Sequence, residues 1–214
     1  MTIEAVIWDF GGVFTTSPFE AFNRYEAQHG LPRDLIRTVN ATNPDRNAWA
    51  LFERAEIDRR GFDSKFLDES TALGYPLRGA EVLPLLSGEV RPRMVEALLI
   101  CKQRFMVGCI TNNMVLGHTS GMPVSSEGAS RAGDIMQHFH AIIESSKVGL
   151  RKPDPRIYLM MCAQLGAEAG ACVYLDDLGV NCKSAARLGM AAIKVVSESQ
   201  ALADLEGATG LTFP

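Results

Sequence analysis

The sequence predicts an α/β protein in which a doubly wound parallel sheet carries one inserted helical unit. Short apolar runs alternate with helical patterns from about residue 91 onward, and strands that alternate with helices form parallel sheets. Another apolar run lies near the N-terminus, and residues 15–88 show helical patterns without a convincing strand. We therefore expect a Rossmann-like core made of residues 1–14 and 89–214, with residues 15–88 inserted as a helical domain.

The first apolar run, residues 5–10, predicts a strand that is buried on both faces. It carries one carboxylate, Asp9, just before Gly11 and Gly12, which allow a tight turn. A carboxylate at the carboxyl end of the first strand lies where open α/β sheets bind ligands. Taken alone, Asp9 is equally well explained as the cap of a turn.

Helix signals follow one another through the inserted residues. A capping-box pattern with proline in the first turn begins at Ser17, and further helices are expected to start at Leu31, Asn47 and Asp63. Residues 75–88 contain prolines and glycines and predict the connection back to the core. The insert should therefore be a cluster of short helices.

The C-terminal part alternates between helices and strands. The expected elements are a helix over residues 92–105, a strand over 106–110, a mobile loop over 117–133, a strand over 141–144, a helix over 155–165, a strand over 171–175, a helix over 180–188 and a strand over 191–196.

Two of the later strands or loops end in polar groups that suit an anion. Thr111 and Asn112 offer a hydroxyl and an amide without charge, which suits phosphate oxygens, although a helix N-cap is the simpler explanation of them alone. Lys152 precedes Pro153, and a second proline after it starts a helix. A cation is unfavourable at a helix N-terminus, so an anion is expected nearby, although a solvated loop also explains it.

Asp176 and Asp177 are adjacent carboxylates at the end of an apolar strand. They repel each other unless a cation or a solvated turn compensates, and a helix N-cap role explains only one of them. Together with Asp9 they predict an all-oxygen magnesium site, completed by a carbonyl, waters and a substrate phosphate.

The composition excludes several classes of function. The 21 basic and 25 acidic residues give a net charge of −4, which argues against nucleic acid as the main partner. The five cysteines contain no Cys-x-x-Cys pair and predict buried free thiols rather than a zinc site. No signal peptide or membrane span is expected, so the predicted location is cytoplasmic.

The order of these groups resembles the haloacid dehalogenase superfamily. The matching motifs are Asp9-Phe10-Gly11-Gly12-Val13, Thr111-Asn112-Asn113, Lys152-Pro153-Asp154-Pro155 and Asp176-Asp177-Leu178-Gly179-Val180-Asn181. The resemblance covers the whole chain, and its helical insert is similar to the mobile cap of that family. Within the family, the chain resembles the phosphatase-like N-terminal domain of soluble epoxide hydrolase and related domains linked to acyl-CoA dehydrogenases.

The resemblance implies a magnesium-dependent hydrolase of a small phosphorylated metabolite. In it Asp9 is the nucleophile, forming an aspartyl-phosphate, and Lys152 neutralises negative charge. Thr111 and Asn112 bind the phosphoryl oxygens, with Gly12 beside the substrate. The implied metal ligands are Asp9, the Gly11 carbonyl, Asp177 directly, and Asp176 directly or through water.

Gly11 departs from the family pattern, because phosphatases of this family carry a second aspartate at that position as acid and base. Loss of general acid–base help costs about 10²–10⁴-fold in rate. A slow phosphatase is therefore expected, or one for esters with good leaving groups. The alternatives are a metal-independent 2-haloacid dehalogenase, which the Asp176-Asp177 pair disfavours, and a binding or regulatory module. The oligomeric state and the exact substrate are left open.

Overall fold

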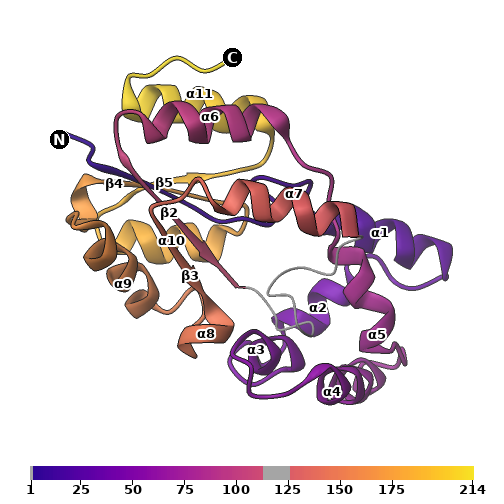
Figure 1. Cartoon of the computed structure of the whole chain (residues 1–214). Coiled ribbons are helices and arrows are strands. Elements are labelled where there is room, and N and C mark those ends of the chain that lie inside the picture. The colour runs from indigo at the N-terminus through magenta and orange to yellow at the C-terminus, as the bar shows by residue number, and fades with distance from the viewer. Residues whose placement is uncertain (1, 113–125) are drawn as a thin grey trace.

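The computed structural model describes residues 2–112 and 126–214, and it contains the predicted sheet. Five parallel strands lie in the order β3-β2-β1-β4-β5 (Figure 1). They are β1 (Ala5–Trp8), β2 (Met106–Thr111), β3 (Ala141–Glu144), β4 (Cys172–Asp176) and β5 (Ala191–Lys194). Strands β2 and β3 lie on one side of β1, and β4 and β5 lie on the other. The doubly wound α/β fold is therefore confirmed.

Helices cover both faces of the sheet. Figure 1 shows α6 (Pro92–Lys102) and α11 (Glu198–Thr209) on one face and α9 (Pro155–Leu165) and α10 (Gly179–Arg187) on the other. The side chains of β1 alternate between these faces, because Val6 and Trp8 pack with the α6 side and Ala5 and Ile7 with the α9 side. All four are fully buried, which explains the unbroken apolar run.

Three further short elements complete the core. They are α7 (Ser126–Met136), α8 (Ser145–Val148) and η2 (Ala169–Ala171). The loop predicted over residues 117–133 is therefore wrong from Ser126 onward, where the chain is helical, and its first part lies outside the described residues. Glycine and serine weaken helix propensity, but this helix gains stability because Ile135 joins the apolar core.

The inserted residues form a separate helical unit beside the sheet (Figure 1). Its elements are α1 (Pro18–Gln28), α2 (Leu35–Ala41), α3 (Ala48–Glu53), α4 (Arg59–Ala72), α5 (Gly79–Val82) and η1 (Leu83–Leu86). The unit has its own apolar cluster, in which Phe62 is fully buried and lies 4.9 Å from both Trp49 and Phe52 between ring centroids. We call these elements the helical insert.

Two predicted helix starts differ from the structure, and one predicted cap makes no capping hydrogen bond. The helix expected from Leu31 begins only at Leu35. Ser17 precedes α1, but its side chain makes no capping hydrogen bond and donates instead to Asp177. The fourth helix begins after Asp58, whose carboxylate accepts from the Gly61 amide, and not at Asp63. Asp63 lies inside α4, pairs with Arg78 and accepts from the Ala80 amide in the first turn of α5, so its charge is used at the start of a different helix.

Two chain segments connect the insert to the core and run antiparallel to each other. Thr15 forms a bridge with Val90, and the Thr16 amide donates to the Glu89 carbonyl at 2.8 Å. The Arg91 amide donates to the Phe14 carbonyl at 2.8 Å. This pairing lies next to the expected domain boundaries, which stay a prediction.

The predicted state of the cysteines is confirmed, because all five are buried free thiols. None of the helices in the described part of the chain has the length and apolar character needed to cross a bilayer.

We expect Phe62→Ala to lower the free energy of unfolding by about 3–5 kcal/mol, because it leaves a cavity among the aromatic rings of the insert. Urea denaturation followed by circular dichroism measures this loss. Tyr75→Ala is the matched control, since Tyr75 is 40% exposed and its loss should cost less than about 0.5 kcal/mol. Equal losses in the two variants would contradict a separate core in the insert.

Candidate active site

The site begins with two neighbouring strand ends. Asp9 follows β1 and Asp176 ends β4, and the residues before them, Trp8 and Leu175, are paired in register. The two carboxylates therefore lie side by side at the carboxyl edge of the sheet. The Lys152 ammonium joins them, with Nζ 2.7 Å from Asp9 Oδ1 and 2.8 Å from Asp176 Oδ2.

Lys152 is a buried cation whose side chain is only 1% exposed. Burial alone lowers its pKa, but the charges of Asp176 and Asp9 more than compensate and raise the pKa above the usual lysine range. An ammonium group has three protons, and two of them are used on these carboxylates. The third is available to an anionic ligand.

Asp9 presents one oxygen that is held and one that is open. Its Oδ1 accepts from the Phe10 amide at 2.6 Å and from Lys152, while within the described part of the chain Oδ2 has no hydrogen-bond donor. Burial raises the pKa of Asp9 well above its usual value, and the charges of Asp176 and Asp177 add to this against the opposing effect of Lys152. A bound cation would favour the ionised form that a nucleophile needs.

Asp176 is saturated with hydrogen bonds. Its Oδ1 accepts from the Leu178 amide at 2.8 Å and from Asn181 Nδ2 at 3.0 Å. Its Oδ2 accepts from Lys152 Nζ, from the Tyr174 hydroxyl and from Asn181 Nδ2. A carboxylate has about four acceptor sites, so this arrangement leaves no free site for direct metal coordination. Asp176 orients Lys152, and contact with a metal through water is the remaining option.

Asp177 is the more open member of the pair. It is half-buried, and its Oδ2 accepts from Ser17 Oγ at 3.3 Å. Burial, followed by repulsion from Asp176, raises the pKa of Asp177 to about 6. Among the described residues this carboxylate forms no ion pair, and the charge of Lys152 only partly opposes the rise in its pKa.

A divalent cation fits the donor atoms present. Oxygen atoms of Asp9, Asp176 and Asp177 lie within 4.8 Å of one another, and those of Asp9 and Asp177 are open to direct coordination. The pKa values of Asp9 and Asp177 are raised, so these two carboxylates gain from a positive charge between them. An all-oxygen set is the type that Mg²⁺ prefers.

Gly12 makes the close approach of Asp177 possible. Its φ is +72°, and an added Cβ would lie 2.2 Å from Asp177 Oδ2. The Gly12 amide donates to Thr15 Oγ1 at 3.2 Å, and its carbonyl accepts from Arg91 Nη1 at 2.9 Å. Both polar atoms of the Gly12 main chain are thus hydrogen-bonded within the protein. The role of Gly12 as a contact to substrate stays a prediction.

The second strand end contributes Thr111 and Asn112. Thr111 is buried at the end of β2, which lies next to β1. The Asn112 side chain is hydrogen-bonded to the main chain of Lys152, with Oδ1 accepting from the amide at 2.8 Å and Nδ2 donating to the carbonyl at 3.1 Å. Asn113 lies outside the described residues.

The helical insert contacts the core beside Lys152. Arg151 Nε donates to Glu53 Oε2 at 2.6 Å, and Arg151 Nη1 donates to the Pro44 carbonyl at 3.0 Å. Ser145 Oγ donates to the Glu53 carbonyl at 2.7 Å. Burial raises the pKa of Glu53, and Arg151 opposes this effect.

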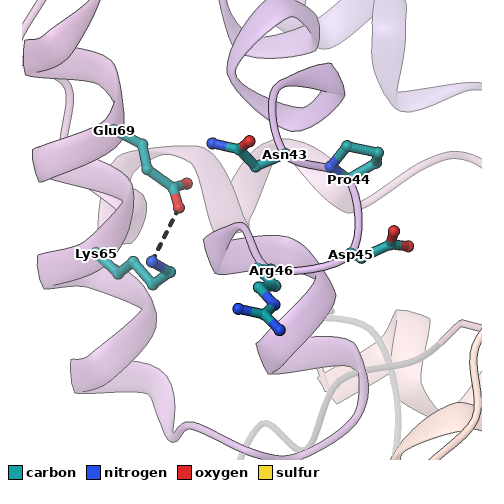
Figure 2. Close-up of a pocket in the computed structure, with 6 residues that line it drawn as sticks. All are labelled: Asn43, Pro44, Asp45, Arg46, Lys65 and Glu69. Atoms are coloured by element: carbon teal, nitrogen blue, oxygen red, sulfur yellow. Dashed lines mark ion pairs between the residues drawn. The ribbon is translucent and has the colours of Figure 1, made fainter.

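A pocket on the insert does not belong to this site. Figure 2 shows it lined by residues of the α2–α3 connection and of α4, with Lys65 and Glu69 ion-paired. The pocket has a volume of about 600 Å³, and Lys65 Nζ lies 3.3 Å from Glu69 Oε1. Its lining residues are Asn43, Pro44, Asp45, Arg46, Lys65 and Glu69. The strand-end carboxylates and Lys152 take no part in it.

Sequence reasoning missed three supporting residues, Tyr174, Asn181 and Glu53, and expected a fourth, Ser17, to cap a helix. Each of the four contacts one of the charged groups of the site or the adjacent Arg151. Asn181 offered a signal, because it lies in the first turn of α10, five positions after the Asp176 carboxylate that it contacts. The contact of Glu53 depends on how the insert packs on the core, for which the sequence has no local signal.

The chain belongs to the haloacid dehalogenase-like hydrolase family, whose model matches residues 3–189. It is 38% identical over 229 residues to bifunctional epoxide hydrolase 2 of Sus scrofa, covering 99% of this chain and 40% of that protein. It is 26% identical over 211 residues to phosphatase MT3486 of Mycobacterium tuberculosis, covering 94% of this chain and 90% of that one. The chain spans less than half the length of the first of these relatives, and 19% of a mouse acyl-CoA dehydrogenase family member 10.

Solved structures support the same fold. One is a Bacteroides thetaiotaomicron enzyme of the family in complex with magnesium and inorganic phosphate, with a TM-score of 0.58 and 15% identity over 92% of this chain and 96% of that one. Another is L-2-haloacid dehalogenase from Xanthobacter autotrophicus, with a TM-score of 0.59 and 15% identity over 97% of this chain and 83% of that one. At this identity the likeness establishes the fold only.

We expect Gly12→Ala to displace Asp177 and to weaken Mg²⁺ binding at least tenfold, measured by isothermal titration calorimetry. The matched control is Gly210→Ala, because Gly210 has a φ of +70° but open space around its Cβ position. Both variants should lose about 1–2 kcal/mol of stability from left-handed backbone strain. Unchanged Mg²⁺ affinity in Gly12→Ala would contradict the placement of Asp177 as a metal ligand.

Proposed function

We propose that this hydrolase is a magnesium-dependent phosphatase that acts on a small phosphate ester through an aspartyl-phosphate on Asp9. The observation that carries the proposal is the buried Lys152 ammonium, which holds one oxygen of Asp9 and leaves the other open near the Asp177 carboxylate. The similarity to a mycobacterial protein named as a phosphatase supports the same reaction class.

The reaction follows from the placement of these groups. Asp9 Oδ2 attacks phosphorus, and the bond from phosphorus to the leaving oxygen breaks as the new bond forms. The third Lys152 proton and the Thr111 hydroxyl hydrogen-bond the phosphoryl oxygens, whose negative charge they stabilise. Water then attacks the phosphorus of the intermediate, which releases inorganic phosphate and restores the Asp9 carboxylate.

The metal would be held by Asp9, Asp177 and the Gly11 carbonyl, with Asp176 in contact through water. Bound there, Mg²⁺ supplies positive charge that shields the phosphate from the Asp9 carboxylate. The saturated hydrogen bonds of Asp176 support this division between the two neighbouring aspartates.

Gly11 limits the chemistry to favourable leaving groups. The insert brings one carboxylate to the core beside Lys152, that of Glu53, but this group is engaged in an ion pair with Arg151. The leaving oxygen is therefore expected to take its proton from water. Esters of acidic alcohols or phenols are the preferred substrates, since their anions leave without a proton.

Two other functions are tested in the same assays. A metal-independent dehalogenase for 2-haloacids is disfavoured because Asp177 would repel an anionic acid unless a cation compensated it. A binding or regulatory module is favoured by one observation, the glycine at position 11 in place of an acid.

We expect Asp9→Asn to reduce the hydrolysis of p-nitrophenyl phosphate by about 10³-fold or more, because the amide is not a nucleophile. Asp154→Asn is the matched control: Asp154 caps α9, and asparagine caps a helix equally well, so activity should stay within about twofold. Full activity in Asp9→Asn would remove Asp9 as the nucleophile. Metal-independent halide release from 2-chloropropionate by the wild type would replace the phosphatase proposal with dehalogenation.

We expect Mg²⁺ affinity to rise at least about tenfold between pH 5 and pH 7. The pKa of Asp177 is about 6 in the metal-free protein, so protons compete with the metal below that value. The effect of pH on the stability of the metal-free protein has the opposite sign. The Asp177 carboxyl ionises near pH 4 in the unfolded chain, so its contribution to stability falls as the pH rises from about 4 to about 6. Calorimetric titrations at both pH values test this, and an affinity independent of pH would contradict it.

A further inference from the structure

The Asn112 side chain pairs with both main-chain polar groups of one residue, Lys152. Its oxygen accepts from the Lys152 amide at 2.8 Å, and its nitrogen donates to the Lys152 carbonyl at 3.1 Å. The two residues are 40 positions apart in the sequence, so this contact ties the end of β2 to the loop before α9. The Asn112 amide thus gives the Lys152 main chain the two hydrogen bonds that a neighbouring strand would otherwise provide.

This pairing opposes any rotation of the Asn112 side chain toward a phosphoryl group. Turning the amide toward a ligand would leave the Lys152 amide and carbonyl without these partners in a partly buried place. An unpaired buried polar group costs as much free energy as a new hydrogen bond would return.

The contact instead fixes the position of the Lys152 main chain, from which the side chain with the catalytic ammonium extends. The Lys152 side chain has a flexible stem of four carbons, and its Nζ must lie between Asp9 and Asp176. Asn112 anchors the main-chain end of that stem, while the two carboxylates hold the other end. The same loop is held on its other side by Ser184, whose Oγ donates to the Pro153 carbonyl at 2.7 Å.

We propose that Asn112 is a positioning residue for Lys152, acting through the lysine main chain, and that its side chain is not a ligand of the transferring phosphoryl group. The inference rests on the proposed function for its kinetic part only. It assigns phosphate recognition on this side of the site to Thr111 and to the Lys152 ammonium.

A double-mutant cycle tests the proposal on p-nitrophenyl phosphate. We expect Asn112→Ala to lower kcat at least tenfold in the wild type but less than threefold in a Lys152→Met background, because its effect passes through the lysine. A direct phosphate ligand would cause the same loss in both backgrounds, and that result would overturn the proposal. Ser184→Ala, which loosens the same loop one residue further on, should stay within threefold of the wild type.

A binding measurement covers the case in which Lys152→Met turns over too slowly to assay. Calorimetric titration with inorganic phosphate in the presence of Mg²⁺ should show that Asn112→Ala weakens binding in the wild type and leaves it unchanged in Lys152→Met. Equal weakening in both would again identify Asn112 as a ligand and overturn the proposal.

Hydrogen exchange separates this inference from the proposed function, because it needs neither substrate nor turnover. The Lys152 amide should exchange at least tenfold faster in Asn112→Ala than in the wild type, while the amides of β1 stay protected. Unchanged exchange at Lys152 would overturn the inference even if the wild type is an active phosphatase. Faster exchange in a protein without phosphatase activity would leave the anchoring role intact and reject the proposed function.

Discussion

The site depends on one buried ammonium held between two carboxylates. Lys152 is almost completely buried and lies within hydrogen-bond distance of both Asp9 and Asp176. Neither the cation nor the carboxylates would be stable in this position alone, because a buried charge without a partner is strongly unfavourable. The parallel register of β1 and β4 supplies the two anions, and the loop before α9 supplies the cation. The sheet topology therefore determines which charged groups meet at the site.

The surrounding polar groups divide the two adjacent aspartates into different roles. Asp176 is enclosed by Tyr174, Asn181, Lys152 and the Leu178 amide, so its charge is already compensated. Asp177 has only the Ser17 hydroxyl as a side-chain partner in the described part of the chain, and its pKa is raised. One carboxylate therefore stabilises the protein, and the next one along the chain has negative charge to offer a ligand.

The fold and the place of the site could be predicted because both depend on local patterns. Apolar runs identified the strands, and in a parallel sheet the polar residues that follow them must meet at one edge. Helix starts in the insert were less predictable, since Asp58 and Asp63 are both acceptable caps and only tertiary packing selects between them. The contacts of Ser17 and Glu53 join segments distant in sequence, and no periodicity or motif reports them.

The two consecutive glycines that follow β1 differ in what evolution or design can do with them. Gly12 has a left-handed backbone and lies against Asp177, so any side chain there disturbs that carboxylate. Gly11 is not among the residues with a positive φ, so an aspartate there would not need a left-handed backbone. Glycine and aspartate codons can differ by a single base. An acid at position 11 is therefore one mutational step away, and the efficiency of this site can change without rebuilding the turn that forms it.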